Sequence, residues 1–386
     1  MTEWTECKIS DIGMVVGGAT PSTKKSENYE NGTIAWITPK DLSAFSGRYI
    51  QRGERNITET GLKSCSTQLL PKNTVLFSSR APIGYVAIAA NEVCTNQGFK
   101  SIVPNANTDA LFLYYLLKHN KDKIEGMGSG TTFKEVSGNI MKNIVVSVPT
   151  DKKVQEIIAS VLGTIDDKIE ESERINNNLE QQAQAIYQRM FIDNASSDWE
   201  EGTLSDIADI TMGQSPSGSS YNEDGNGTIF FQGRAEFGFR FPTVRLYTTE
   251  PKRMACTNDT LMSVRAPVGD LNVAHVDCCI GRGLAAIHSK NNHQSFVLYT
   301  MFSLKKQLDV FNGEGTVFGS INRNSLNDMP LIIPSSDKLD EFEALVAPMD
   351  AAIRNNYDEI CRLEQLRDSL LPKLMSGELD VSDIEL

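Results

Sequence analysis

The chain has no long run of apolar residues. Its 386 residues are 40% hydrophobic, yet no stretch approaches the roughly 20 consecutive apolar residues that a membrane-spanning helix needs. The first six residues also lack the basic and apolar regions of a secretion signal. We therefore expect a cytoplasmic protein of two or three domains that has no membrane partner.

Patterns that bind metal ions are missing as well. The seven cysteines form no CxxC pair, and the four histidines form no HExxH sequence. Reduced, buried thiols are the ordinary state of cysteine in the cytoplasm. We expect neither a metal site nor disulfides, and we interpret Cys94 and Cys279 as core residues.

Catalytic motifs are equally scarce. The sequence contains no GxxxxGK[ST] loop for phosphates and no nucleophile elbow. These absences argue against a nucleotide-dependent enzyme and against a hydrolase of the common type, and they predict no cofactor and no catalytic residue. An enzyme with an unfamiliar active site stays open as an alternative.

What the chain does contain is a repeat of itself. Trp4 recurs 195 residues later as Trp199, and Arg80-Ala81-Pro82-Ile83-Gly84 recurs 185 residues later as Arg265-Ala266-Pro267-Val268-Gly269. A repeat this long corresponds to two whole domains in tandem rather than to the small units of a solenoid. None of the four histidines has a counterpart in the other half, so an active site present once per domain would not be built on histidine.

The formal net charge of −13 seems unsuited to binding nucleic acid, but it is unevenly distributed. Residues 1–150 carry a net charge of +3 and residues 199–336 carry −3, whereas residues 151–198 and 337–386 carry −5 and −8. The acidity is therefore concentrated in the segments between and after the two blocks. Charge permits a local site for a polyanion on the blocks without by itself indicating one.

Each half ends in a long amphipathic segment. In residues 151–192, and again in residues 336–377, apolar residues recur every three or four positions, which is the spacing of one face of an α-helix. At 1.5 Å per residue, such a helix is about 60 Å long, too long to be covered by one small domain. We therefore expect the two helices to pack on each other. Pro348 and Pro372 predict that the second helix is bent or interrupted.

The other residues, 1–150 and 193–335, form two blocks of mixed α and β. Short β-rich runs alternate with Gly, Pro, Asn and Ser turns, and each block contains one clear short helix, near residues 111–119 and 296–304. The sequence thus predicts an α+β fold in which two tandem homologous α/β domains are separated by two long helices. An acidic tail, residues 378–386, ends the chain and is expected to be disordered after Leu379.

The strongest motif of each block is Ser-x-Arg-Ala-Pro-[Ile/Val]-Gly, at residues 78–84 and 263–269. The proline and the glycine fix a tight turn beside an arginine, whose guanidinium can bind a phosphate or the edge of a guanine. Alternatively, Arg80 and Arg265 pair with an internal carboxylate or carbonyl and lock the turn. The sequence does not decide between these two roles.

A second element changes between the blocks. Asn96-Gln97-Gly98-Phe99 aligns with Gly281-Arg282-Gly283-Leu284, so that the second glycine is kept while Gln97 is replaced by Arg282. An amide pairs bidentately with adenine and a guanidinium with guanine. The replacement is therefore what two related readers of different DNA sequences would show, although neutral drift in a surface loop gives the same pattern.

Glycine-rich segments at residues 126–133 and 313–318 complete the set. Glycine lets main-chain N–H groups approach an anion closely, so these segments are candidates for contact with a phosphate backbone; the alternative is a flexible connector before the last strand. The turns at residues 17–22 and 213–217 are interpreted as structural corners.

Repeated twice in the same order, these features resemble the specificity subunit of type I restriction-modification systems. The shared signatures are the Gly-x-[Thr/Ser]-Pro-Ser turn, the Arg-x-x-[Ile/Val]-Gly element, Asn96–Phe99, the glycine-rich loop and the Leu374–Leu379 segment at the end of the last helix. The resemblance covers nearly the whole chain. It implies a non-catalytic subunit in which residues 1–150 and 193–335 are target recognition domains, each reading one half of a bipartite double-stranded DNA site.

The resemblance also implies partners for the helices. Helices 151–192 and 336–377 would pack antiparallel in a coiled-coil-like, pseudo-two-fold arrangement, set the spacer between the half-sites and dock two adenine methyltransferase subunits, with endonuclease/translocase subunits joining the complex. The residues expected to dock these subunits are Ile165, Ile169, Leu179, Ile186, Met349, Ile353, Leu363 and Leu370. The residues expected to contact DNA are Lys24, Lys25, Arg80, Asn96, Gln97, Thr131, Thr132, Lys134, Gln214, Arg234, Arg265, Arg282, Thr316 and Arg323.

Two other interpretations stay open. A fused DNA methyltransferase or nuclease with an unrecognised active site would bind S-adenosylmethionine or ATP by itself. A scaffold would use the two domains to bind protein or glycan, and substitution of Arg80 or Arg265 would then leave DNA methylation unchanged.

Overall fold

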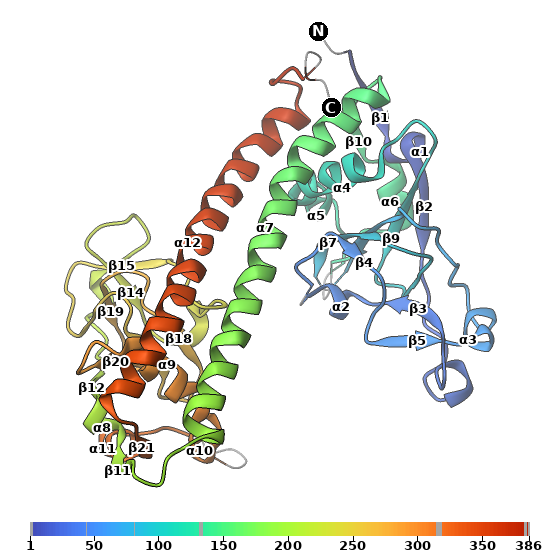
Figure 1. The fold of residues 1–386 in the computed structure, drawn as a ribbon. Coiled ribbons are helices and arrows are strands. Elements are labelled where there is room, and N and C mark those ends of the chain that lie inside the picture. The colour runs from blue at the N-terminus through green and yellow to red at the C-terminus, as the bar shows by residue number, and fades with distance from the viewer. Residues whose placement is uncertain are drawn as a thin grey trace. The chain divides into compact units, whose positions relative to one another are not determined.

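The computed structural model describes residues 3–43, 45–80, 82–130, 134–313, 319–381 and 384. The chain forms two compact units: Met1–Glu171 with Glu359–Leu386 make the first, and Ser172–Asp358 make the second. Each unit contains one globular domain and a section of both long helices, α7 (Lys152–Tyr187) and α12 (Ser336–Met375), which Figure 1 shows in green and in orange to red.

Domain 1 is built on two sheets and an outer pair of strands. The outer pair joins β1 (Trp4–Lys8) to β10 (Val145–Pro149) in antiparallel register. The larger sheet has the order β2 (Gly13–Gly17), β9 (Lys100–Pro104), β6 (Val75–Ser79), β7 (Ile83–Ala89), β4 (Tyr49–Ile50), and the smaller has the order β5 (Arg55–Ile57), β3 (Ile34–Ile37), β8 (Cys94–Thr95). Its helices are α1 (Ile9–Ile12), α2 (Pro39–Ser43), α3 (Glu59–Lys63), α4 (Ala110–His119), α5 (Lys121–Gly126) and α6 (Gly138–Asn143).

Domain 2 has the same plan. β11 (Glu200–Thr203) pairs with β21 (Pro330–Ile333). One sheet has the order β12 (Ala208–Met212), β20 (Leu284–Ser289), β17 (Thr260–Ser263), β18 (Leu271–Val273), and the other has the order β13 (Tyr221–Asn222), β15 (Leu246–Thr248), β14 (Thr228–Phe231), β19 (Cys278–Ile280), β16 (Met254–Ala255). Its helices are α8 (Leu204–Ile207), α9 (Gln294–Ser303), α10 (Lys305–Asp309) and α11 (Arg323–Asn327).

The predicted repeat is confirmed in the strand order. The series β2-β9-β6-β7 of domain 1 corresponds to β12-β20-β17-β18 of domain 2. The parallel pair of β3 with β8, in which Trp36 lies opposite Cys94, corresponds to the parallel pair of β14 with β19, in which Phe230 lies opposite Cys279. Both cysteines are fully buried, as the interpretation of them as core residues predicts.

The short helix α4 shows why the sequence folds in this way locally. The Asp109 carboxylate accepts a hydrogen bond from the Phe112 N–H at 2.7 Å and so caps the first turn. The helix is apolar on nearly all sides, and six of its residues are buried, which is typical of a helix enclosed between other elements. It packs on β7 of its own domain, and the Tyr115 hydroxyl donates to Asp166 of α7 at 2.6 Å.

Within each unit, the sections of α7 and α12 run antiparallel. In the first unit, Arg367 pairs with Asp166 at 3.0 Å and Lys168 pairs with Glu359 at 3.9 Å. In the second unit, the Asn356 amide donates to Asn176 at 2.8 Å, and the ring of Phe342 lies 5.9 Å from the ring of Tyr187. The paired positions fall along α12 as they rise along α7, so the expected antiparallel packing of the two helices is confirmed in both units.

Two expectations about the end of the chain are contradicted in part. α12 is one continuous helix from Ser336 to Met375, so neither Pro348 nor Pro372 interrupts it. Proline fits the helical φ angle, and the loss of one backbone hydrogen bond is offset by the packing of Phe342, Val346 and Ile353, none of which is exposed. In the tail, Val381 is 4% exposed and belongs to the core of the first unit, so this part of the tail is ordered.

None of the helices that the structure describes is long and apolar enough to cross a bilayer.

Candidate nucleic-acid interface

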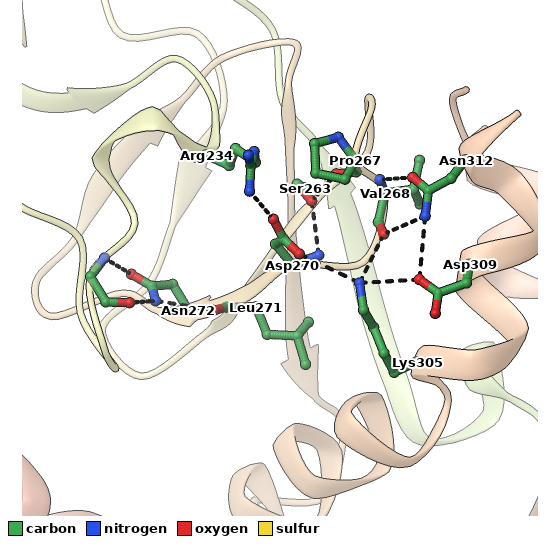
Figure 2. A network of polar contacts seen from close by, with 11 residues as sticks. Arg234, Ser263, Pro267, Val268, Asp270, Leu271, Asn272, Lys305, Asp309 and Asn312 are labelled. Atoms are coloured by element: carbon green, nitrogen blue, oxygen red, sulfur yellow. Dashed lines mark hydrogen bonds and ion pairs between the residues drawn. The ribbon is translucent and has the colours of Figure 1, made fainter. Parts of the chain in front are cut away.

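The serine of the Ser-x-Arg-Ala-Pro-x-Gly motif makes equivalent hydrogen bonds in both domains. The Ser78 hydroxyl donates to the Pro82 carbonyl at 2.8 Å and accepts from the Tyr85 N–H at 2.8 Å. In domain 2, the Ser263 hydroxyl donates to the Pro267 carbonyl at 2.7 Å and accepts from the Asp270 N–H at 2.9 Å, as Figure 2 shows. The serine therefore bridges the turn, and its presence in the motif has a structural cause.

The last residue of the motif is a glycine for a conformational reason. Gly84 has a φ angle of +98° and Gly269 has a φ angle of +87°, a region that side chains with a Cβ rarely adopt. Each glycine also lies close to a short helix, Gly84 to Lys121 of α5 and Gly269 to Leu308 of α10. A Cβ at Gly269 would lie 3.0 Å from the Leu308 Cβ. The turn therefore lies so close to α10 that there is little room for a side chain at Gly269.

We expect Gly269→Ala to lower the free energy of unfolding of the second unit by about 1–3 kcal/mol, because an alanine at this φ angle is strained and its methyl group meets Leu308. Urea denaturation measures the change. Gly225→Ala is the matched control, since Gly225 has a φ angle of +83° but its Cβ would meet nothing within 4 Å. Equal losses for the two variants would contradict a role for the contact with Leu308.

In each domain, the arginine turn contacts two other parts of the chain. In domain 1, the Ser79 N–H donates to the Gly98 carbonyl at 2.7 Å, and the Val136 N–H donates to the Ser79 carbonyl at 2.9 Å. In domain 2, the Val264 N–H donates to the Gly283 carbonyl at 2.9 Å, and the Ile321 N–H donates to the Val264 carbonyl at 3.1 Å. The arginine turn thus lies between the loop of Gly98 or Gly283 and the chain that follows the glycine-rich segment.

The Gly-x-[Thr/Ser]-Pro-Ser turn supports the same loop from the other side. The Ala19 N–H donates to the Thr95 carbonyl at 3.0 Å, and in domain 2 the Gln214 N–H donates to the Ile280 carbonyl at 3.0 Å. The residue before Ala19 is Gly18, and the residue before Gln214 is Gly213. A Cβ atom would lie 2.2 Å from the Thr95 carbonyl oxygen at Gly18 and 2.1 Å from the Gly281 carbonyl oxygen at Gly213, so neither position has room for a side chain. The turn acts as a structural corner that positions the loop.

This loop presents different side chains in the two domains. Gln97 is exposed at its tip in domain 1 and accepts a hydrogen bond from the Thr20 hydroxyl. Arg282 is exposed at the same place in domain 2. Its backbone N–H donates to the Ser215 hydroxyl at 3.2 Å. Asn96 differs from both, because its half-buried side chain accepts from the Gly98 N–H at 2.8 Å and so holds the loop.

The two motif arginines differ in their surroundings. The Arg80 guanidinium lies 4.0 Å from the Glu135 carboxylate, which also pairs with Lys100 at 3.3 Å. Arg265 is exposed, and no carboxylate in the part of the chain that the structure describes forms an ion pair with it. The turn-locking role therefore applies in part to Arg80, whereas the Arg265 guanidinium faces solvent.

Arg265 lines a hollow on domain 2. The hollow has a volume of about 370 Å³, and Arg234 and Arg245 also line it. Arg234 pairs with Asp270, which lies between Arg234 and Lys305 in Figure 2, and Arg245 pairs with Glu236 at 2.9 Å. Guanidinium groups thus surround a concave surface beside the loop of Gly283.

The other residues expected to contact DNA are scattered. Lys24 lies with Arg55 in a separate hollow near the start of domain 1, and Lys25 pairs with Glu27 at 3.6 Å. Those that the structure leaves exposed are Lys24, Lys25, Lys134, Gln214 and Arg323. Thr131, Thr132 and Thr316 lie outside the described residues.

The arginine that attaches domain 1 to α7, Arg48, belongs to none of the motifs described above. The side chain of Arg48 is 5% exposed, and its Nε donates to Glu170 at 2.9 Å while Nη1 donates to the Gly163 carbonyl at 3.2 Å. It also pairs with Asp167. Burial alone lowers the pKa of a guanidinium, but the two carboxylates hold the pKa of Arg48 above its ordinary value.

Arg240 has the same role in domain 2. Its side chain is 4% exposed and pairs with Glu180 of α7 at 3.0 Å and with Asp350 of α12 at 3.1 Å. The Tyr299 hydroxyl donates to the same Asp350 at 2.9 Å. Burial raises the pKa of Glu180 in spite of the opposing charge of Arg240. One sequence feature is common to Arg48 and Arg240: each is the last residue of a Phe-x-x-Arg sequence, at residues 45–48 and 237–240, and the two copies are 192 residues apart.

The residues expected to dock partner subunits mostly face inward within their own units. Ile169 is 6% exposed and Ile353 is not exposed at all, whereas the other six are partly buried: Ile165, Leu179, Ile186, Met349, Leu363 and Leu370. Several of them pack on the core of the adjoining domain. Apolar residues that the long helices leave exposed are instead Ile175, Leu345 and Leu366.

The described cysteines are all free thiols. Among the described residues, no group of three or more His, Cys, Asp or Glu side chains is arranged to hold a metal ion.

Known proteins share this sequence and fold. The family model described as the type I restriction modification DNA specificity domain matches residues 1–181 and again residues 196–341. The type I restriction enzyme MjaIX specificity subunit of Methanocaldococcus jannaschii is 34% identical over 418 aligned positions, which cover 99% of this chain and 95% of that protein. The EcoR124I/EcoR124II specificity subunit of Escherichia coli is 27% identical over 40% of this chain and 39% of its own.

A solved structure supports the fold. The crystal structure of a type I restriction-modification system S subunit from M. genitalium matches with a TM-score of 0.63, at 18% identity, over 97% of this chain and 96% of that one. The family model covers both domains, and the relative from M. jannaschii covers nearly the whole chain. The chain therefore belongs to the family of type I restriction-modification DNA specificity subunits.

Proposed function

We propose that this chain recognises DNA for a type I restriction-modification complex, with each domain reading one half of a bipartite sequence. The observation that carries the proposal is the repeated loop frame with a changed tip. The same backbone hydrogen bonds hold the loop in both domains, yet the exposed tip is Gln97 in one and Arg282 in the other. Phosphate contacts position a protein on DNA, whereas side chains that reach base edges determine which sequence it reads.

The charge distribution supports a division of labour. Residues 151–198 and 337–386 are strongly acidic, so the helices would repel a DNA duplex rather than lie along it. Their exposed apolar residues, Ile175, Leu345 and Leu366, suit contact with protein instead. The helices are therefore the surface on which two adenine methyltransferase subunits would dock, with endonuclease/translocase subunits completing the complex, and the chain itself supplies recognition rather than catalysis.

Methylation sequencing tests this function. We expect cells that express the chain with its methyltransferase subunits to carry adenine methylation at one split sequence, two short specific parts separated by a spacer of fixed length. Cells that express the methyltransferase subunits alone are the control. Methylation of the same sites in that control, or of a contiguous sequence only, would contradict the proposal.

A further inference from the structure

The equivalent arginines Arg80 and Arg265 stand on the same backbone frame. Arg80 forms an antiparallel bridge with Glu135, and Arg265 forms the equivalent antiparallel bridge with Ser320. A carboxylate therefore lies beside the guanidinium in domain 1, at 4.0 Å, whereas domain 2 has a small neutral hydroxyl at that position. The backbone bridge is therefore equivalent in the two domains, but the negative charge beside the arginine is present in domain 1 and absent at the equivalent position, Ser320, in domain 2.

The surroundings of Arg265 add to this difference. Of the three guanidinium groups that line the hollow, those of Arg234 and Arg245 are engaged by Asp270 and Glu236. Glu236 also lines the hollow, but its side chain is only 6% exposed and its carboxylate accepts a hydrogen bond from Arg245 at 2.9 Å. Arg265 is exposed, and within the described ranges of the chain no acidic side chain pairs with it.

The lining of the hollow indicates what Arg265 meets. The rigid fork of N–H donors on a guanidinium matches the geometry of a phosphate, and phosphate contacts are those that position a protein on DNA. The hollow is concave, with a volume of about 370 Å³, and a Cβ at Gly233 on its lining would meet nothing within 4 Å. The backbone at Gly233 is therefore open to a close approach by an anion.

We propose that Arg265 binds a phosphate of the DNA backbone in the hollow that it lines with Arg234 and Arg245. This inference rests on the proposed function and deepens it, because it assigns Arg265 to positioning the duplex and leaves sequence reading to the loop tip at Arg282. The equivalent Arg80 of domain 1, which shares Glu135 with Lys100, makes a weaker contact of this kind or none.

The dependence of DNA binding on salt tests the proposal in the assembled complex. Each phosphate contact contributes about 0.9 to the slope of log K against log salt concentration, so we expect Arg265→Gln to reduce the slope by about 1 and Arg265→Lys to preserve it. Ser320→Glu places a carboxylate where domain 1 has Glu135, and we expect it to reduce the slope as Arg265→Gln does. Ser320→Gln, of similar size but neutral, should leave the slope unchanged.

The methylated sequence separates the possible outcomes. If Arg265 holds a phosphate, all four variants methylate the parental sequence. Only Arg265→Gln, which removes the positive charge, and Ser320→Glu, which places a carboxylate beside it, bind more weakly across all sequences. An unchanged slope for both Arg265→Gln and Ser320→Glu, in variants whose circular dichroism matches the parent, would overturn the assignment. A changed base preference with Arg265→Gln would overturn it in favour of base reading. Absence of sequence-specific binding by the parental complex would instead reject the proposed function.

Discussion

Replacing Arg240 by methionine is expected to lower the local stability of the second unit by about 3 kcal/mol. The change leaves Glu180 and Asp350 without the cation that they share, and the loss of one partner from a buried ion pair costs about 3–5 kcal/mol. Native-state hydrogen exchange measures the effect. The amides expected to respond are those of residues 172–187 in α7, which include Glu180, and those of α9, whose Tyr299 donates to Asp350. They should exchange faster by about two orders of magnitude.

Two further variants identify the cause of that loss. Arg253→Met makes the same chemical change at an exposed position of domain 2 and should alter exchange little. The triple variant Arg240→Met, Glu180→Gln, Asp350→Asn removes the unpaired charges while keeping the volume of the side chains, and it should recover at least half of the lost stability. If the triple variant is no more stable than Arg240→Met, or if Arg253→Met costs as much, the ion pair is not what joins domain 2 to the helices.

Exchanging the two loop tips, Gln97→Arg and Arg282→Gln, is expected to change one base in each half of the methylated sequence. Both side chains are exposed on loops that equivalent backbone hydrogen bonds hold in place. Glutamine pairs bidentately with adenine and arginine with guanine, and each such pair contributes about 1–3 kcal/mol of discrimination. The preference for the original base should fall by about 10-fold to 100-fold.

The single variants give the sharper result, because each should alter only one half of the sequence. Methylation sequencing reads both halves in one experiment, so the unaltered half serves as an internal control. Arg362→Gln, at an exposed position of α12, controls for the loss of a positive charge and should preserve the sequence. A change in both halves from one substitution, or in neither half from the double exchange, would show that the tips do not read bases.

Local patterns in the sequence predicted much of the fold. The helical spacing of apolar residues predicted the two long helices, and β-rich runs bounded by turns predicted strands such as β6 and β17. These elements depend on residues close together in the chain. Arg48 and Arg240 were missed because their carboxylate partners lie far away in sequence, 122 residues for Glu170 and 110 residues for Asp350. The repeated Phe-x-x-Arg marks the two arginines, but it does not show which carboxylates they bind.

The order of the amino acids was enough to predict two homologous domains with a long helix after each, because repeats and periodic apolar residues can be recognised in the sequence. It also determined which loop tips differ. The surroundings of the two motif arginines became known from the folded chain alone, since the bridges that place Glu135 beside Arg80 and Ser320 beside Arg265 join residues 55 positions apart. The charge that a guanidinium offers to DNA depends on such neighbours, and the folding of the sheets brings these neighbours together.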